Sequence, residues 1–104
     1  MEVDINRESF DLLKTSDKLI VIDFWAPWCG PCRMMSKTIS NLSEKYSDNA
    51  IIGKCNVEDN EEFSENFDIR NLPTIVFIKN GEVLDKVSGL KSEEELASKI
   101  LELQ

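Results

Sequence analysis

The feature that most constrains the fold is the apolar run from Leu19 to Phe24, which is interrupted only by Asp23. A strand with one face in water alternates apolar and polar residues, whereas a strand covered on both faces is apolar almost throughout. The run therefore predicts a central strand over residues 18–25, covered on both faces by other elements.

Helical patterns are predicted over four segments: about residues 7–15, 31–46 and 61–66, and one that follows Ser92. Asn6 is a suitable N-cap for the first helix, and Pro31 suits the first turn of the second because it needs no backbone donor there. Ser92 and Glu95 have the spacing of a capping box at the start of the last helix. These signals define where the helices begin better than where they end.

Three further strands are predicted over residues 50–57, 74–79 and 83–88. The dipeptide Asn80-Gly81 between the last two is typical of a type I′ turn, so these two strands form a hairpin. Strands and helices alternate, then a hairpin and a final helix follow. This order predicts the α/β class, with a mixed sheet and helices on both of its faces.

Length and composition bound the function. The chain of 104 residues is expected to be one domain over residues 1–104, and its 41% hydrophobic and 31% charged residues are those of an ordinary globular protein. The N-terminus lacks the layout of a signal peptide and no apolar stretch is long enough to cross a bilayer, so a cytoplasmic location is expected. The net charge, 12 − 20 = −8, argues against nucleic acid and membrane surfaces as partners.

The cysteines demand a chemical explanation. The chain has three cysteines and no histidine, so it cannot supply the four ligands of a structural zinc site by itself. Cys29 and Cys32 are separated by two residues, a spacing that allows a redox disulfide, and Cys29 lies where a helix begins. Backbone N–H groups at a helix N-terminus favour thiolate, which makes Cys29 the expected nucleophile. Cys55 alternates with apolar neighbours and is interpreted as a buried core thiol.

The segment from Phe24 to Cys32 resembles the active-site signature of the thioredoxin family. The similarity extends along the chain to Asp23, Lys54, Asn71-Leu72-Pro73-Thr74, Lys79-Asn80-Gly81 and Gly89. It implies the thioredoxin fold, a central mixed five-stranded sheet flanked by four helices. Two positions depart from the common pattern. Lys37 stands where many members have a helix-kinking proline, and Asn71 replaces a frequent glycine, although asparagine tolerates left-handed backbone conformations.

The resemblance also assigns roles at the redox pair. Cys32 would resolve the mixed disulfide formed on Cys29, and Asp23 would help to deprotonate Cys32, with Lys54 pairing Asp23 from the neighbouring strand. Burial should raise the pKa of Asp23 and suit it to this task. The alternatives are a strand-end aspartate in water for Asp23 and a solvated lysine for Lys54. Gly30 and Pro31 would tune the pair, since Gly30 lets another chain approach and Pro31 presets the helical backbone.

A substrate-binding surface is implied as well. The bond before Pro73 would be cis, Pro73 would pack against the cysteine pair, and the Leu72 backbone would pair with an extended client segment. The residues expected on this flat, largely uncharged surface are Trp28, Gly30, Pro31, Leu72, Pro73 and Gly89. Such a surface suits client proteins of varied sequence.

The expected function is a general protein disulfide reductase that cycles between dithiol and disulfide. It needs no bound cofactor, acts as a monomer, and depends on a thioredoxin reductase of the flavin/NADPH or the ferredoxin type. A disulfide oxidant or isomerase is the second hypothesis, although those roles usually accompany a dipeptide other than Gly-Pro. The third is a redox-gated binding module or assembly subunit that uses the same surface without turnover.

Overall fold

A computed structural model describes residues 2–104, and a five-stranded sheet lies at its centre. The strands are β1 (Val3–Asp4), β2 (Leu19–Trp25), β3 (Ala50–Asn56), β4 (Thr74–Lys79) and β5 (Glu82–Ser88), in the spatial order β1-β3-β2-β4-β5. β1, β3 and β2 run parallel, whereas β4 is antiparallel to β2 and β5 is antiparallel to β4. β2 occupies the central position that its apolar run predicts.

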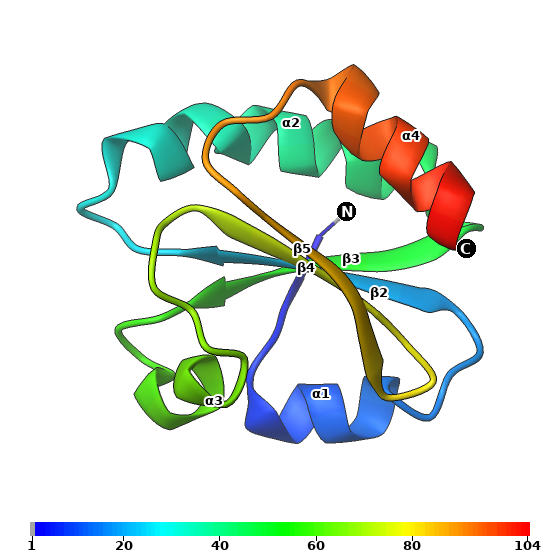
Figure 1. Ribbon diagram of the computed structural model, residues 1–104, viewed down its shortest axis with the longest axis horizontal. Coiled ribbons are helices and arrows are strands. Elements are labelled where there is room, and N and C mark those ends of the chain that lie inside the picture. The colour runs from blue at the N-terminus through cyan, green and yellow to red at the C-terminus, as the bar shows by residue number, and fades with distance from the viewer. Residues whose placement is uncertain (1) are drawn as a thin grey trace.

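Four helices cover the two faces of the sheet. They are α1 (Arg7–Leu13), α2 (Gly30–Lys45), α3 (Glu61–Asn66) and α4 (Glu93–Leu103). Figure 1 shows α2 and α4 above the sheet and α1 and α3 below it. The predicted α/β class and the number of helices are confirmed. α1 ends two residues before the predicted boundary, and α2 continues through Lys37 without interruption.

The sheet divides the apolar residues into two cores, because successive side chains of a strand point to opposite faces. Leu19 and Val21 of β2 pack with side chains of α2 and α4, whereas Ile20, Ile22 and Phe24 pack with those of α1 and α3. By this alternation Asp23 lies on the α2 side. A carboxyl group is thus held in the layer between the central strand and the helix that carries both redox cysteines.

β1 is the element that the sequence analysis missed, since two exposed residues carry no readable pattern. Its place depends on Gly53, the register partner of Val3 in β3. A Cβ atom added to Gly53 would lie 2.5 Å from the Val3 carbonyl oxygen and 2.5 Å from Ile5 Cδ1. The missing side chain therefore gives β1 the room to pair with β3 and seats Ile5 in the core.

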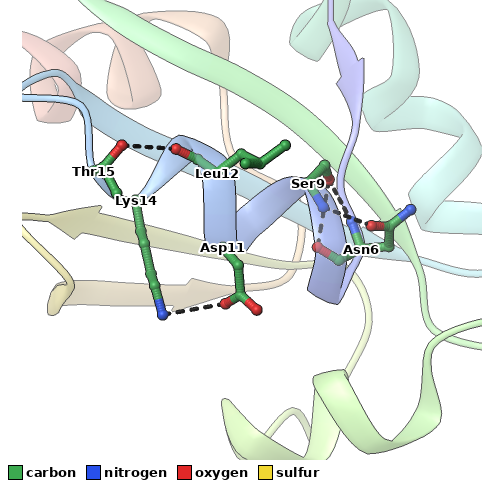
Figure 2. A network of polar contacts seen from close by, with 6 residues as sticks. All are labelled: Asn6, Ser9, Asp11, Leu12, Lys14 and Thr15. Atoms are coloured by element: carbon green, nitrogen blue, oxygen red, sulfur yellow. Dashed lines mark hydrogen bonds and ion pairs between the residues drawn. The ribbon is translucent and has the colours of Figure 1, made fainter.

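The start of α1 shows how side chains complete a helix end (Figure 2). Asn6 Oδ1 accepts a hydrogen bond from the Ser9 amide at 2.8 Å, and Ser9 Oγ accepts one from the Asn6 amide at 2.9 Å. At the other end, the Thr15 hydroxyl donates to the Leu12 carbonyl oxygen. The reciprocal pair satisfies two amides that the helix itself leaves unpaired, and it confirms the predicted N-cap.

The last part of the chain also follows its predictions. Ser92 and Glu95 form the expected capping box at α4. Asn80 and Gly81 have φ of 53° and 79°, and a type I′ turn requires positive values at both positions. The β4–β5 hairpin is confirmed. Within residues 2–104, none of the helices combines the length and the apolar character needed to cross a membrane.

Candidate functional site

The redox pair lies where the loop that follows β2 leads into α2. Cys29 is the N-cap of α2, and its Sγ accepts a hydrogen bond from the Cys32 amide at 3.2 Å. Pro31 occupies the first turn, as its missing N–H predicts. The two sulfurs form a disulfide, with the Cα atoms 5.3 Å apart. A thiolate on Cys29 would thus be stabilised by an amide donor and by the positive end of a 16-residue helix.

A groove with a volume of about 540 Å³ passes beside Cys29. Four of the residues expected on the client surface line it, namely Trp28, Gly30, Pro31 and Leu72. Five further residues line it that the sequence analysis did not assign to the site, namely Val57, Ser64, Ile69, Arg70 and Asn71. Ile69, Arg70 and Asn71 directly precede Leu72, whereas Val57 directly follows β3 beside the disulfide. Only the folded chain brings these two segments together.

Pro73 and Gly89 lie next to each other but do not line this groove. The Leu72–Pro73 bond is cis, as the resemblance implies, and the Gly89 amide donates to the Pro73 carbonyl oxygen at 2.9 Å. Gly89 has φ of 87°, a conformation that favours glycine. Asn71 differs from expectation, because positive φ occurs at Asp68 nearby and not at Asn71 itself. The Gly89 contact thus holds the segment that supplies Leu72 to the groove.

Trp28 forms the exposed rim of the groove. Its side chain is 66% exposed, yet the ring is oriented by a hydrogen bond of 2.8 Å from Nε1 to Glu58 Oε2. Glu58 belongs to the acidic stretch that leads into α3. The Trp28 ring therefore provides an apolar surface beside Cys29, and the Glu58 carboxylate holds the ring in place.

Asp23 is buried behind the disulfide, with 1% of its surface exposed. Its Oδ1 atom finds no hydrogen-bond partner among the described residues. Burial raises the pKa of Asp23 to about 7, the Lys54 ammonium opposes this rise, and the Glu2 carboxylate adds to it. A carboxyl group with this pKa exchanges protons readily at neutral pH, which is the property that a proton acceptor needs.

Lys54 is the register partner of Asp23 on β3. Its ammonium nitrogen lies 4.8 Å from the centre of the Trp25 ring, in a cation–π arrangement. Both side chains belong to the part of the chain that the structure describes, and no direct ion pair joins them. Lys54 acts on Asp23 through its charge rather than through a contact.

Cys32 opens onto a different space from Cys29. A small cavity of about 60 Å³ lies between α2, β2 and β3, and Cys32 and Asp23 both line it. Its other lining residues are Trp25, Arg33, Ser36 and Lys54. The two cysteines are bonded to each other, but one borders the open groove and the other a polar cavity that holds the buried acid. This arrangement suits a nucleophile on one side and a proton transfer on the other.

Cys55 stands apart from the redox pair. It is fully buried in the core on the α1 and α3 side of the sheet, and it forms no disulfide. Burial raises the pKa of its thiol to about 11. The interpretation as a core thiol is confirmed. Over residues 2–104 no group of three or more histidine, cysteine or acidic side chains is placed to hold a metal ion.

Comparisons with known proteins agree along nearly the whole chain. The sequence profile of the Thioredoxin family matches residues 2–102. Thioredoxin H4 of Arabidopsis thaliana is 42% identical over 98 residues, which cover 94% of this chain and 82% of that protein. Thioredoxin-T of Drosophila melanogaster is 40% identical over 91 residues, 86% of this chain and 58% of the fly protein. The solved structure of Malassezia sympodialis thioredoxin (Mala s 13) has a TM-score of 0.90 and 32% identity, with 99% of this chain and 90% of that one covered.

Proposed function

Because the chain belongs to the thioredoxin family, we propose that its Cys29–Cys32 pair reduces disulfide bonds in a broad range of client proteins. The thioredoxin fold predicted from the sequence is confirmed, and the chain is a thiol–disulfide oxidoreductase. The observation that carries the proposal is the division of the site. Cys29 caps α2 at the edge of a groove, whereas Cys32 shares a small polar cavity with Asp23.

The first step is attack by the Cys29 thiolate on a client disulfide. A bond forms between Cys29 Sγ and one client sulfur, the client S–S bond breaks, and the other client sulfur leaves as a thiolate. The amide donor from Cys32 and the α2 dipole stabilise the attacking thiolate before the bond forms. Client and protein are then joined by a mixed disulfide.

The second step releases the client. Cys32 gives its proton to the Asp23 carboxylate, and the Cys32 thiolate attacks Cys29 Sγ. The Cys29–Cys32 disulfide forms as the bond to the client breaks, so two electrons have passed to the client. Lys54 tunes this step, since its positive charge keeps more Asp23 in the carboxylate form at neutral pH.

The groove supplies the client site. Trp28, Gly30, Pro31 and Leu72 provide a surface with few charges, and the open space above Gly30 leaves room for a second chain. Pro73 and Gly89 position Leu72, whose backbone pairs with an extended client segment. Few side-chain contacts are specific in such a site, and this accounts for the proposed breadth of clients.

Replacing Cys32 with Ser tests the two-step mechanism. The variant keeps the nucleophile but lacks the resolving thiol, so client proteins should accumulate as mixed disulfides on Cys29. Their amount is measured by non-reducing electrophoresis of the variant after incubation with oxidised insulin. A Cys55→Ser variant, which leaves the redox pair intact, is the matched control and should reduce insulin without trapping it. Absence of any trapped insulin on Cys32→Ser would contradict the mechanism.

The reduction potential separates the competing roles. A general reductant should have a value close to about −270 mV, the value known for thioredoxin, whereas about −120 to −180 mV is typical of disulfide oxidants and isomerases. Equilibration of the wild-type protein with glutathione mixtures measures it. A redox-gated binding module would show the dithiol and disulfide states but no catalytic turnover of insulin.

The wider setting is part of the same proposal. A thioredoxin reductase, using flavin and NADPH or ferredoxin, returns the disulfide to the dithiol. The protein works in the cytoplasm as a single-domain monomer over residues 1–104, and neither nucleic acid nor a membrane is its partner. The Gly-Pro dipeptide within the redox pair supports a reducing compartment, and the net charge of −8 supports the exclusion of phosphate-rich partners.

A further inference from the structure

Ser36 lines the cavity behind the disulfide and has no role in the two steps described above. Ser36 lies on α2 one turn beyond Cys32, so both side chains point from the same face of the helix. We propose that Ser36 is a positioning residue whose hydroxyl holds water between Cys32 and Asp23, so that the proton of Cys32 leaves on the side of the disulfide opposite to the client. This inference rests on the proposed function and concerns its second step.

The cavity has the size and the lining that bound water requires. Its volume of about 60 Å³ corresponds to about two water molecules at their volume in the liquid. Oδ1 of Asp23 is buried and has no partner within the described chain, and a buried carboxylate oxygen left in that state is costly. Water in the cavity removes this cost, because it donates to Oδ1 and bonds to a second polar group.

Ser36 is the group best suited to fix that water. A hydroxyl both donates and accepts hydrogen bonds, so it can orient water toward a thiol and a carboxylate together. The Arg33 guanidinium is engaged elsewhere, since Nη1 donates to the Pro27 carbonyl oxygen at 3.0 Å. The Lys54 ammonium, at the other wall, lies over the Trp25 ring. Of the neutral side chains that line the cavity, only Ser36 carries a hydroxyl.

The position of the cavity gives this route its advantage. None of the residues that line it also lines the client groove. A client bound across the groove therefore covers Cys29 and leaves the cavity uncovered. Since the mixed disulfide must lose a proton from Cys32 while the client is still attached, an exit on the far side lets resolution proceed under a bound client.

The proton balance is simple. The Cys32 thiol passes its proton through the water held by Ser36 to the Asp23 carboxylate, and the Cys32 sulfur then attacks Cys29 Sγ. The client leaves as a thiolate, which takes a proton from solvent, and Asp23 returns its own proton to solvent through the same cavity. No oxidant or reductant is consumed beyond the client disulfide.

The charged and titratable groups around Asp23 come from three segments. They are Lys54 and Cys55 on β3, Cys32 and Arg33 on α2, and Glu2 before β1. On β4 the register partner of Asp23 is Ile75, which is apolar. None of these groups changes in a Ser36 variant, so a change in the pH dependence of resolution would report on the water and not on a new charge.

The experiment compares Ser36→Ala with wild type in the reaction of the reduced protein with 5,5′-dithiobis(2-nitrobenzoate). This disulfide releases one coloured thiolate when Cys29 attacks and a second when Cys32 resolves, so stopped-flow absorbance separates the two steps. In Ser36→Ala the second release should be slower by about fivefold to tenfold near neutral pH, a part of what a positioned proton transfer contributes. The first release should be unchanged. The two proteins should converge at about pH 9, where hydroxide deprotonates Cys32 directly.

Two variants control the comparison. Ser40→Ala makes the same chemical change one turn further along α2, at a residue that is also half-buried, and should leave both releases unchanged. Ser36→Thr retains the hydroxyl and should restore the second release. The inference is overturned if Ser36→Ala resolves as fast as wild type, if both releases slow in parallel, or if Thr fails to restore the rate. Failure of the proposed function looks different, because wild type would then show no second release at all.

Discussion

At the scale of single residues, Asp23 is a group whose charge opposes folding. In an unfolded chain its pKa is near 3.8, and burial raises it to about 7 in the folded protein. Between these two values the folded state binds more protons than the unfolded state. The contribution of Asp23 to stability therefore decreases as pH rises from about 4 to about 7 and stays constant above that range. The difference of about three pKa units corresponds to on the order of 4 kcal/mol.

Replacing Asp23 with Asn should remove this penalty. We expect the free energy of unfolding of the oxidised protein to rise by about 2–4 kcal/mol at about pH 8, and to change little at about pH 4, where Asp23 is already neutral. Urea denaturation of both proteins at the two pH values measures the difference. Asp17→Asn, at an exposed position, is the control and should have a small effect at both. An equal gain at the two pH values would mean that charge burial is not the cause.

Single residues also show how far chemistry can be inferred from a sequence. Cys29, Cys32 and Asp23 were predictable because a close pair of thiols without histidine and an acid inside an apolar run are both unusual. Ser36 and Arg70 were not, because a serine in a helix and an arginine in a loop are ordinary. Ser36 lines the cavity and Arg70 lines the groove only because the fold brings distant parts of the chain beside them.

At the scale of elements, the edge strand β1 depends on the absence of one side chain. Gly53→Ala would place a methyl group 2.5 Å from the Val3 carbonyl oxygen and from Ile5 Cδ1. We expect β1 to shift and the free energy of unfolding to fall by about 1–3 kcal/mol, as overpacking of a core usually costs. Urea denaturation gives the size of the effect, and amide hydrogen exchange at Ile5, whose N–H donates to the Lys54 carbonyl oxygen, locates it.

Gly30→Ala is the matched substitution, because a Cβ atom there would meet no heavy atom within 4 Å apart from its chain neighbours and the backbone of its own helix. It should leave stability unchanged or slightly higher, since alanine favours a helix. If the two variants were equally stable, the close approach of β1 to Gly53 would not be a cause of destabilisation.

Elements with strong local signals were predicted, and those held by distant partners were not. The run in β2, the cap at Asn6 and the Asn80-Gly81 turn each carry their own physical reason for the structure they adopt. β1 is two residues long and exists because β3 offers it a parallel edge at Gly53. No local pattern could reveal it. The family resemblance implied a mixed sheet of five strands, but the order of the strands across the sheet comes from the structure alone.

At the scale of the whole molecule, the net charge of −8 should influence which clients arrive fastest. The acidic stretch that begins at Glu58 borders the groove through the Trp28 hydrogen bond. Long-range attraction therefore favours client segments with lysine or arginine near the disulfide. This is a kinetic preference, added to a binding surface that is itself largely uncharged.

The salt dependence of client reduction tests this preference. For two peptide disulfides that differ only in carrying lysine or glutamate beside the cysteines, the lysine peptide should be reduced about tenfold faster at low salt. Raising the salt concentration from about 0.01 M to about 1 M should bring the two rates together, because the charges are then screened. Stopped-flow fluorescence or thiol release measures both. Rates that differ equally at both salt concentrations would point to contacts in the groove instead of long-range charge.

Cys55 is buried on the opposite side of the sheet from the redox pair, and this affects which disulfides the protein can form. A third thiol beside a disulfide offers two further pairings, and a molecule that exchanged among them would lose its active bond without any change in oxidation state. Here the sheet separates the partners, and the thiol with a pKa of about 11 is almost never a nucleophile. Each folded molecule therefore holds either the Cys29–Cys32 disulfide or the dithiol, which carries one more electron pair. A disulfide to Cys55 does not compete with the active one.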